Sequence, residues 1–446
     1  MWPTFRIELV APPFAGHLFP ALGAAARLKL RRDVQVTCAT TSGGAAAVER
    51  AGIAYRELLP GNDARIRAIA DPPRRVGSNP LRMLDQFRAN LALMRQLIDE
   101  LEATWSAAPP DLVIADFCVP FAGLTARRMG IPWWTGMPTP CALETRSGPP
   151  TYLGGWRPHD GPLWRVRDAA GRAFVSGFKR FVARAFRSSL VSLGIESGPY
   201  RDDGWELIYS NEKILGYAMR EFEFERGWPD WFEFVGPISA DPGRAGSEPE
   251  FVSGKQHCLI SLGTHVPWAK RQAVELFRRV ARLAPDWEFH FSWGDATRTE
   301  VRAEGNFREL PFVSYDRYLE RYDAVVMHGG TGVGYACIGA GRPMLVWPQD
   351  YDQFDHAARL VHHGLARRLR PSPRRVIADL ERIVGDPQAI ESRERFREAH
   401  RRYDAPRTVE KEVESLMLRT GKLFGERRQG KSVDCVQMLR SKPRDD

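Results

Sequence analysis

Short runs of apolar and β-branched residues alternate along the chain with longer segments in which apolar residues recur every three or four positions. In the first half, the short runs lie at 5–11, 33–39, 111–116 and 131–136. The long segment at 79–105 places these residues on one helical face: Leu84, Phe87, Leu91, Met94, Ile98, Leu101 and Trp105. Strands and helices that alternate at this spacing predict a parallel sheet with right-handed crossovers.

The same alternation starts again in the second half of the chain. Its short apolar runs lie at 257–263, 287–293, 323–328 and 343–348, again separated by segments with helical periodicity. Between the halves, residues 232–250 are rich in proline, glycine, serine and glutamate, which is typical of a linker.

Length and composition agree with two domains. The 446 residues exceed the usual size of a single core, and the hydrophobic share of 43% is enough to fill two. No apolar run approaches the ~18 residues of a membrane span. We therefore predict an α/β protein with two doubly wound domains, 1–238 and 251–403, followed by a terminal helix and a basic tail over 404–446.

The net charge indicates which classes of partner to expect, and the cysteines indicate the redox compartment. The formal net charge of +9 suits anionic ligands or an anionic membrane, but arginine is spread along the chain rather than gathered in one block. Without a zinc-finger, basic-zipper or RNP-like motif, nucleic acid is not an expected partner. The six scattered cysteines, with no C-x-x-C pair, are typical of reduced thiols in a cytoplasmic protein and predict no metal site.

In open parallel sheets, ligands bind outside the carboxyl ends of the strands, so the residues after each short run are candidates for chemistry. His17 follows the first run, and Asp116 ends the run at 111–116. An aspartate bonded to one imidazole nitrogen fixes the tautomer and raises the basicity of the other. Two hypotheses remain from the residues alone. The pair is a general base, or His17 caps its helix while Asp116 pairs with an arginine.

A glycine-rich stretch follows the run at 323–328. Such glycines let backbone N–H groups approach a phosphate, and the N-terminus of the next helix favours negative charge. The stretch supplies neither a G-x-G-x-x-G fingerprint nor a phosphate loop ending in Gly-Lys-Ser/Thr. Asp352 and Gln353 follow the run at 343–348. We interpret Asp352 as an acceptor of hydrogen bonds from sugar hydroxyls rather than as a metal ligand.

Taken together, these stretches resemble the motifs of family 1 glycosyltransferases, the UDP-glycosyltransferase-like enzymes of the GT-B fold. The matching motifs follow the family's order and spacing over nearly the whole chain: GHLFPAL (16–22), DLVIAD (111–116), FVGP (234–237), SLGT (261–264), LPFVSYDRYL (310–319), HGGTG (328–332), GRP (341–343) and DQFDHA (352–357). The longer stretch DQFDHAARLVHHGLARRL (352–369) resembles bacterial transferases acting on lipids, carotenoids or polyketides more than it resembles the plant enzymes. The GT-B fold consists of two Rossmann-like domains that face each other across a crevice.

The resemblance implies an activity. It is the inverting, metal-independent transfer of a hexose from a UDP- or dTDP-sugar to a hydroxyl group of a small, hydrophobic acceptor, with no cofactor. His17 would be the base for the acceptor hydroxyl, and Asp116 would orient it.

The resemblance also implies a donor site in the second domain. Its residues would be Thr264, Phe312, Val313, His328, Gly329, Gly330, Thr331, Gly332, Asp352 and Gln353. Phe312 would stack on the nucleotide base and Val313 backbone groups would read its edge. His328 and the residues after it would hold the diphosphate with Thr264, while the acid–amide pair would hold the donor sugar.

Two positions depart from the family pattern. Ala336 stands where many relatives carry a glutamate that binds the ribose hydroxyls, so a deoxyribose dTDP donor competes with UDP as the expectation. His356 stands where an asparagine is usual, and it either reaches the ligand or packs on its helix.

The acceptor side leaves alternatives open. Residues 137–156, rich in proline, glycine and aromatic residues, suit a loop that lines the acceptor. Residues 163–190 combine helical apolar periodicity with seven basic residues and one acidic residue. This helix either packs on its own domain or lies on an anionic membrane, which would place the protein at the inner face of that membrane.

Two other functions fit the same architecture. A sugar-nucleotide epimerase of the GT-B fold would need no acceptor, and the GHLFP motif in the acceptor half argues against it. A catalytically silent partner that binds a sugar nucleotide would have no use for both His17 and Asp116.

Overall fold

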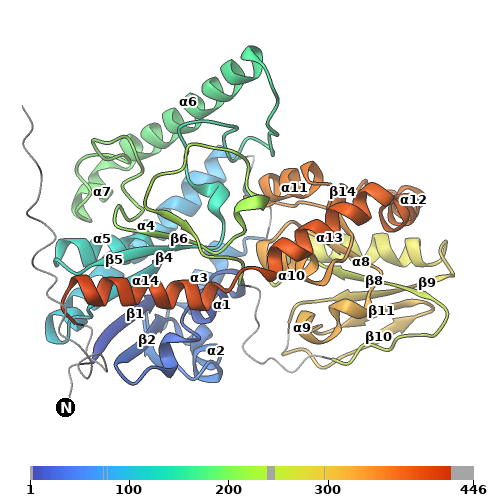
Figure 1. Ribbon diagram of the computed structural model, residues 1–446, viewed down its shortest axis with the longest axis horizontal. Helices are drawn as coiled ribbons and strands as arrows, with labels where there is room; N and C mark the ends of the chain where they lie inside the picture. The colour runs from blue at the N-terminus through green and yellow to red at the C-terminus, as the bar shows by residue number, and fades with distance from the viewer. Residues whose placement is uncertain (1–3, 74, 78, 239–246, 296, 423–446) are drawn as a thin grey trace, which may run out of the picture.

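The computed structural model describes residues 4–73, 75–77, 79–238, 247–295 and 297–422 (Figure 1). Two seven-stranded sheets lie side by side, one in each half of the chain. This confirms the predicted class of two α/β domains with parallel sheets. The domain boundaries at 238 and 251 stay predictions, and residues 239–246 of the linker lie outside the described part.

The first sheet has the order β3-β2-β1-β4-β5-β6-β7, and all its pairs are parallel. Its strands are β1 (Phe5–Val10), β2 (Val34–Thr40), β3 (Ala54–Glu57), β4 (Leu112–Asp116), β5 (Trp133–Met137), β6 (Ile214–Gly216) and β7 (Phe232–Phe234). β7 corrects the linker prediction, because residues 232–234 pair with β6 at the edge of the sheet. The alternating Phe-Glu-Phe sequence suits a half-buried edge strand better than a linker.

The second sheet has the order β10-β11-β9-β8-β12-β13-β14, and β10 alone runs antiparallel to its neighbour. Its strands are β8 (Gln256–Ser261), β9 (Trp287–Ser292), β10 (Arg302–Glu304), β11 (Phe307–Leu310), β12 (Ala324–Met327), β13 (Met344–Val346) and β14 (Ala366–Arg368).

Helices cover both sheets. They are α1 (Ala15–Ala24), α2 (Ala45–Arg50), α3 (Asp63–Ala70), α4 (Pro80–Ala107), α5 (Pro120–Arg128), α6 (Pro162–Ala185), α7 (Arg187–Ser192), α8 (Pro267–Ala281), α9 (Tyr315–Tyr318), α10 (Thr331–Ala340), α11 (Gln353–His362), α12 (Pro373–Gly385), α13 (Pro387–Arg401) and α14 (Ala405–Arg419). None of the helices within the described ranges is long and apolar enough to cross a membrane.

The predicted helix at 79–105 forms as α4. Its first turn is capped by the Asn79 side chain, which accepts hydrogen bonds from the N–H groups of Leu81 and Arg82, and Pro80 occupies the first helical position. All seven residues of the predicted apolar face pack in one core with β1, β4 and α5. The periodicity thus reports burial on a single face.

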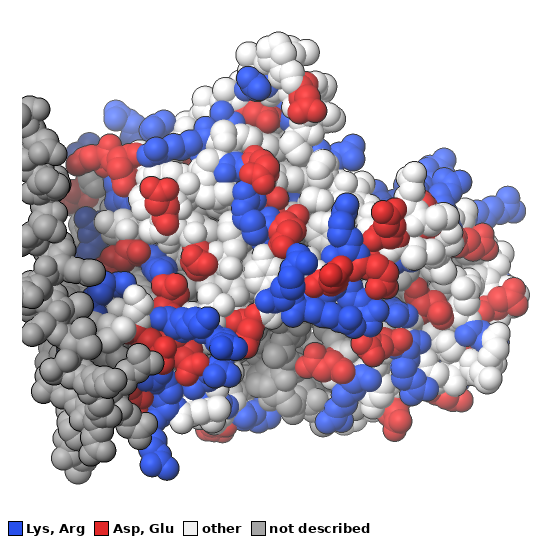
Figure 2. All heavy atoms as spheres, viewed as in Figure 1, with Lys and Arg blue, Asp and Glu red and all other residues white. Residues whose placement is uncertain are grey.

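The terminal helix returns to the first domain. α14 packs on the first sheet, where Ala405, Val409 and Val413 join the core formed around β1 and α1 (Figure 1). The basic tail lies outside the described residues beyond Lys422. Basic and acidic side chains alternate over the face seen in Figure 2, as the even spread of arginine along the chain leads us to expect.

Candidate active site

His17 and Asp116 meet where the parallel strands β1 and β4 end. His17 lies in the first turn of α1, and its Nδ1 is 3.0 Å from Asp116 Oδ1. The Asp116 side chain is almost fully buried and also accepts a hydrogen bond from the Cys118 N–H at 2.9 Å. Because β1 and β4 are neighbours in the sheet, the first residues after each strand face the same edge.

The helix-cap hypothesis for His17 finds no support in this geometry. The N-cap of α1 is Phe14, and no side chain caps the helix. The Asp116 carboxylate pairs with His17 and not with an arginine among the described residues. The ring of His17 also stacks on Phe117, with ring centroids 5.5 Å apart.

The electrostatics of His17 favour its protonated form. Burial lowers its pKa, but the Asp116 carboxylate and the Cys118 thiol raise it more, so the pKa of His17 lies well above its ordinary value. The side chain keeps an exposed fraction of 24%, and Nε2 lies 4.0 Å from Cys118 Sγ.

His17, Asp116 and Cys118 are the one group among the described residues whose ligand atoms lie within 4.8 Å of one another, as a metal site would require.

Asp352 belongs to the second domain but contacts the first. It ends the loop before α11, and its Oδ2 accepts a hydrogen bond of 3.0 Å from Thr139 Oγ1, just after β5. Burial raises the pKa of Asp352, yet His356, Thr139 and His17 together lower it below its usual range. His17 and Asp352 are therefore within electrostatic reach of each other across the two domains.

His356 does more than pack on its helix, because it contacts Asp352, and the alternative that it reaches the ligand stays a prediction. It is buried behind Asp352, with Nε2 3.4 Å from Asp352 Oδ2 and 3.7 Å from Cys141 Sγ. Burial lowers its pKa, but Cys141 and Asp352 raise it above the ordinary value. His356 thus holds the carboxylate that the donor-site prediction assigns to the sugar.

The side chain of Gln353 makes hydrogen bonds within the loop that precedes α11. Its Oε1 accepts hydrogen bonds from the N–H groups of Gln349 at 2.8 Å and Asp350 at 3.1 Å. Asp350 in turn accepts from the N–H groups of Val76 and Gly77 in the first domain, each at 2.7 Å. The role of Gln353 in sugar binding stays a prediction.

The glycine-rich stretch lies between β12 and α10 as predicted. Gly329 has φ +99°, and a Cβ there would lie 2.7 Å from the Gln353 carbonyl oxygen, so only glycine fits. Gly330 is the N-cap of α10, Thr331 begins the helix, and a Cβ on Gly332 would meet only open space. The first N–H groups of α10 are therefore placed to receive an anion.

His328 packs under this loop in a neutral state. Burial, helped by Lys270, lowers its pKa to about 4. Its Nδ1 is buried without a hydrogen-bond partner in the described part of the chain. Thr264 follows β8, which is the neighbour of β12 in the sheet. Gly263, the residue before Thr264, packs on the His328 ring so closely that a Cβ on Gly263 would lie 2.8 Å from the ring. The structure thus brings Thr264 beside the diphosphate candidates.

Phe312 and Val313 lie after β11, on the same edge of the sheet. Both are buried, and the Val313 N–H donates to Ser292 Oγ at 3.2 Å. The Phe312 carbonyl accepts from the Ser247 N–H at 2.9 Å. These backbone groups are paired within the chain in this state, and the role of both residues in base binding stays a prediction.

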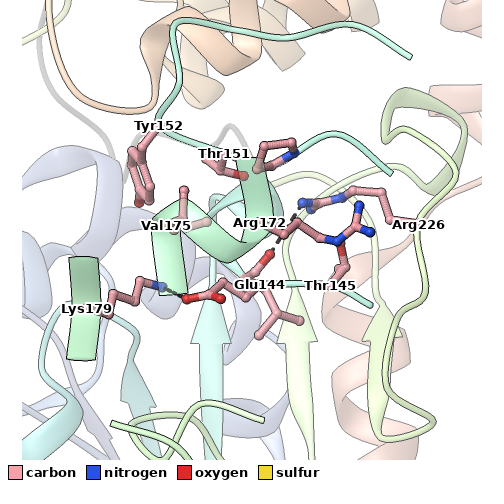
Figure 3. A pocket seen from close by; sticks show the side chains of 11 residues that line it. Glu144, Thr145, Thr151, Tyr152, Arg172, Val175, Lys179 and Arg226 are labelled. Carbon is pink, nitrogen blue, oxygen red and sulfur yellow. Dashed lines mark hydrogen bonds and ion pairs between the residues drawn. The ribbon is translucent and has the colours of Figure 1, made fainter. Parts of the chain in front are cut away.

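A narrow pocket lies between the loop after β5 and the inner face of α6 (Figure 3). It encloses about 280 Å³ of empty space, its open mouth included, and part of its lining comes from 137–156, the segment expected to line the acceptor. Lys179 Nζ pairs there with Glu144 at 2.6 Å and with Glu206 at 2.5 Å. Its lining is completed by Ala142, Leu143, Thr145, Pro150, Thr151, Tyr152, Arg172, Val175 and Arg226.

Sequence reasoning missed two groups at this site. Thr139 follows the predicted run at 131–136, so the rule that led to Asp116 could have found it. Cys118 lies two residues after Asp116, but nothing in its spacing indicates that its thiol comes near His17.

Curated proteins similar to the chain are glycosyltransferases. The oleandomycin glycosyltransferase of Streptomyces antibioticus is 26% identical, with 84% of this chain and 82% of the relative covered. NDP-glycosyltransferase YjiC of Bacillus licheniformis is 24% identical, covering 86% and 91%. The zeaxanthin glucosyltransferase of Pseudescherichia vulneris is 24% identical, covering 85% and 90%. No family model matches the chain.

Solved structures similar to the chain are also glycosyltransferases. The kitacinnamycin glycotransferase superposes with a TM-score of 0.70 at 23% identity, covering 93% of this chain and 99% of that one. The calicheamicin glycosyltransferase CalG4 superposes with a TM-score of 0.66 at 21% sequence identity, covering 93% of this chain and 99% of CalG4. SsfS6 of Streptomyces sp. SF2575, complexed with thymidine diphosphate, superposes with a TM-score of 0.59 at 18% sequence identity, covering 92% of this chain and 99% of SsfS6. The chain is therefore a distant homologue, over most of its length, of the family 1 NDP-glycosyltransferases, and it has their GT-B fold.

Proposed function

We propose that this NDP-sugar glycosyltransferase works by direct displacement, with inversion at the anomeric carbon, and that its acceptor is a small hydrophobic molecule with a free hydroxyl group. The observation that carries the proposal is the His17–Asp116 contact of 3.0 Å, made between side chains at the carboxyl ends of the neighbouring strands β1 and β4. The similar enzymes named for oleandomycin and zeaxanthin support a small, largely apolar acceptor.

His17 acts as the general base. A carboxylate can only accept hydrogen bonds, so Nδ1 donates to Asp116 and the lone pair of the neutral ring lies on Nε2. The acceptor hydroxyl gives its proton to Nε2 as its oxygen bonds to the anomeric carbon. The bond from that carbon to the diphosphate oxygen breaks in the same step, and Asp116 stabilises the imidazolium that forms.

The leaving group departs into the second domain. The diphosphate would be met by the first N–H groups of α10, by Thr331 and by the loop that packs on His328. Such fixed dipoles stabilise charge that develops on the leaving oxygen without reorganising. Asp352, held by Thr139 and His356, would accept hydrogen bonds from the sugar hydroxyls.

Glycosyl transfer itself is tested with UDP- and dTDP-sugars and a panel of hydroxylated acceptors, with products identified by mass spectrometry. We expect glycosylated acceptor and free nucleoside diphosphate in equal amounts, and neither without acceptor. Donor conversion without acceptor would instead indicate an epimerase. Donor binding without turnover across the panel would indicate a silent binding protein.

We predict that chelation by EDTA leaves turnover unchanged. The two carboxylates of the loop before α11 are already engaged, Asp350 by two backbone N–H groups and Asp352 by Thr139 and His356. In the proposed site, helix N–H groups hold the diphosphate instead. Loss of activity with EDTA, restored by magnesium or manganese, would contradict this prediction.

We predict that dTDP-glucose and UDP-glucose bind with similar affinity. Ala336 lies on α10 and has no carboxylate that could accept a hydrogen bond from the ribose 2′-hydroxyl. Matched titrations measure the ratio, and Ala336→Glu is the control, because it should shift the preference toward UDP-glucose. A hundredfold preference of the unaltered chain for UDP-glucose, ~2.7 kcal/mol, would show that another group binds the ribose.

A further inference from the structure

An apolar stripe runs along the outer face of α6. Its members follow one another by three or four residues, which keeps them on one side of a helix: Leu163, Val166, Ala170, Phe174, Gly177 and Phe181. The large ones are strongly exposed, with fractions of 74% for Leu163, 66% for Val166 and Phe174, and 59% for Phe181. Single exposed apolar residues are common, but a contiguous stripe indicates an interaction surface.

The opposite side of α6 holds the helix on the protein. Gly171 and Val175 are buried, and a Cβ on Gly171 would lie 2.7 Å from both Pro150 and Trp156. Val175 and Lys179 line the pocket under the helix (Figure 3). The stripe therefore faces away from the domain that carries α6, and α6 forms the upper edge of the molecule in Figure 1.

Basic residues accompany the stripe without acidic partners. Arg165, Arg180, Arg184 and Arg187 are exposed, and none of them pairs with a carboxylate among the described residues. The one acidic residue of α6 and α7, Asp168, is buried and paired with Arg167 at 2.6 Å. In Figure 2 the outermost tip of the projection over α6 is white, with blue and red side chains directly below it.

We propose that α6 docks on an anionic lipid surface, with the stripe entering the boundary between headgroups and acyl chains. An amphipathic helix with large apolar residues on one face and arginine beside it binds such a surface in the plane of the membrane. A second copy of the chain fits less well. Pairing two stripes would bring unpaired arginines together with no exposed acidic residue on either helix to neutralise them. The inference concerns this surface and holds whatever the reaction.

Co-sedimentation of the full-length chain with vesicles tests the proposal. The vesicles consist of phosphatidylcholine alone or of equal parts of phosphatidylcholine and phosphatidylglycerol. We expect binding to the anionic vesicles only, and a loss of about tenfold or more in Phe174→Glu/Phe181→Glu. Arg180→Gln/Arg184→Gln should bind more weakly and respond less to salt. The matched control is Leu283→Glu/Ile390→Glu, which adds the same charge at exposed apolar residues of the second domain and should bind like the unaltered chain.

Several outcomes would overturn the proposal. One is an unaltered chain that stays in the supernatant with anionic vesicles. A second is a Phe174→Glu/Phe181→Glu variant that binds anionic vesicles as strongly as the control variant does. All variants keep the basic C-terminal residues, so any binding through these residues is the same in each variant and does not affect this comparison. A third is a dimer of the unaltered chain, seen by analytical ultracentrifugation without lipid, that the phenylalanine substitutions dissociate. Melting temperatures of all variants should agree, because the substituted side chains are exposed.

Discussion

Replacing His17 by alanine is expected to lower turnover by about 10²–10⁴-fold, the usual contribution of a general base. Donor affinity should stay nearly constant, because the donor candidates lie in the second domain while His17 lies in the first. Turnover comes from the rate of nucleoside diphosphate release, and donor affinity comes from calorimetric titration. A well-folded His17→Ala chain with near-normal turnover would contradict the proposed chemistry.

Asp116→Asn separates orientation from basicity. An amide in place of the carboxylate keeps the shape but can present the wrong partner to Nδ1, so turnover should fall less than in His17→Ala but still strongly. The double variant should lose little more than His17→Ala, because Asp116 acts through His17. Additive losses would mean that Asp116 has a role of its own.

The pH dependence gives a second readout of the same pair. The base must be unprotonated, and the pKa of His17 is raised, so turnover should increase with pH as His17 loses its proton, at a pH well above that of ordinary imidazole. Asp116→Asn removes a main cause of the raised pKa, so the increase should move toward lower pH while the plateau falls. A purely structural role for Asp116 would leave the position of the increase unchanged.

The second large effect is expected from Glu223→Gln, which should reduce the free energy of unfolding by about 3–5 kcal/mol. Glu223 is buried and accepts from Arg359 of α11 at 2.8 and 2.9 Å, and Arg226 lies 3.7 Å away. The amide would leave two buried guanidinium groups without a countercharge. Burial and Arg359 already lower the pKa of Arg226 to about 10.

The control lies two residues further along. Glu225 is 88% exposed and pairs with Arg220, so Glu225→Gln should change stability by less than about 1 kcal/mol. Urea unfolding measures both variants. Burial raises the pKa of Glu223, but Arg359 and Arg226 lower it overall, so its contribution is complete above the ordinary glutamate pKa of about 4.3 and is lost as the pH falls below that. Equal effects of the two substitutions would contradict the assignment.

Sequence patterns predicted the elements that bury a full face. The eight runs correspond to strands, and the α4 periodicity corresponds to one packed face, because burial on one side leaves a period in the sequence. The three-residue strands β6, β10 and β14 lie outside these runs. Their pairing depends on neighbours that are distant in the chain.

The candidate site divides in the same way. His17 and Asp116 could be predicted because His17 follows β1 and Asp116 ends β4, and the carboxyl ends of parallel strands share an edge. The position of His356 could not, because it depends on Asp352 and on Cys141, 215 residues away. The Glu223–Arg359 pair likewise joins residues 136 positions apart. Contacts between the two domains leave no local pattern.

The return of α14 to the first sheet means that the chain crosses between the domains twice, once between β7 and β8 and once between α13 and α14. The two crossings touch. Gly236 has φ +108°, a Cβ there would lie 2.7 Å from Tyr403 Cβ, and Tyr403 Oη accepts from the Arg220 N–H at 2.9 Å. Because two segments of the chain join the domains at this point, we expect relative motion of the domains to centre on it. Opening of the domains should therefore be a swing about this point, with the widest gap on the far side.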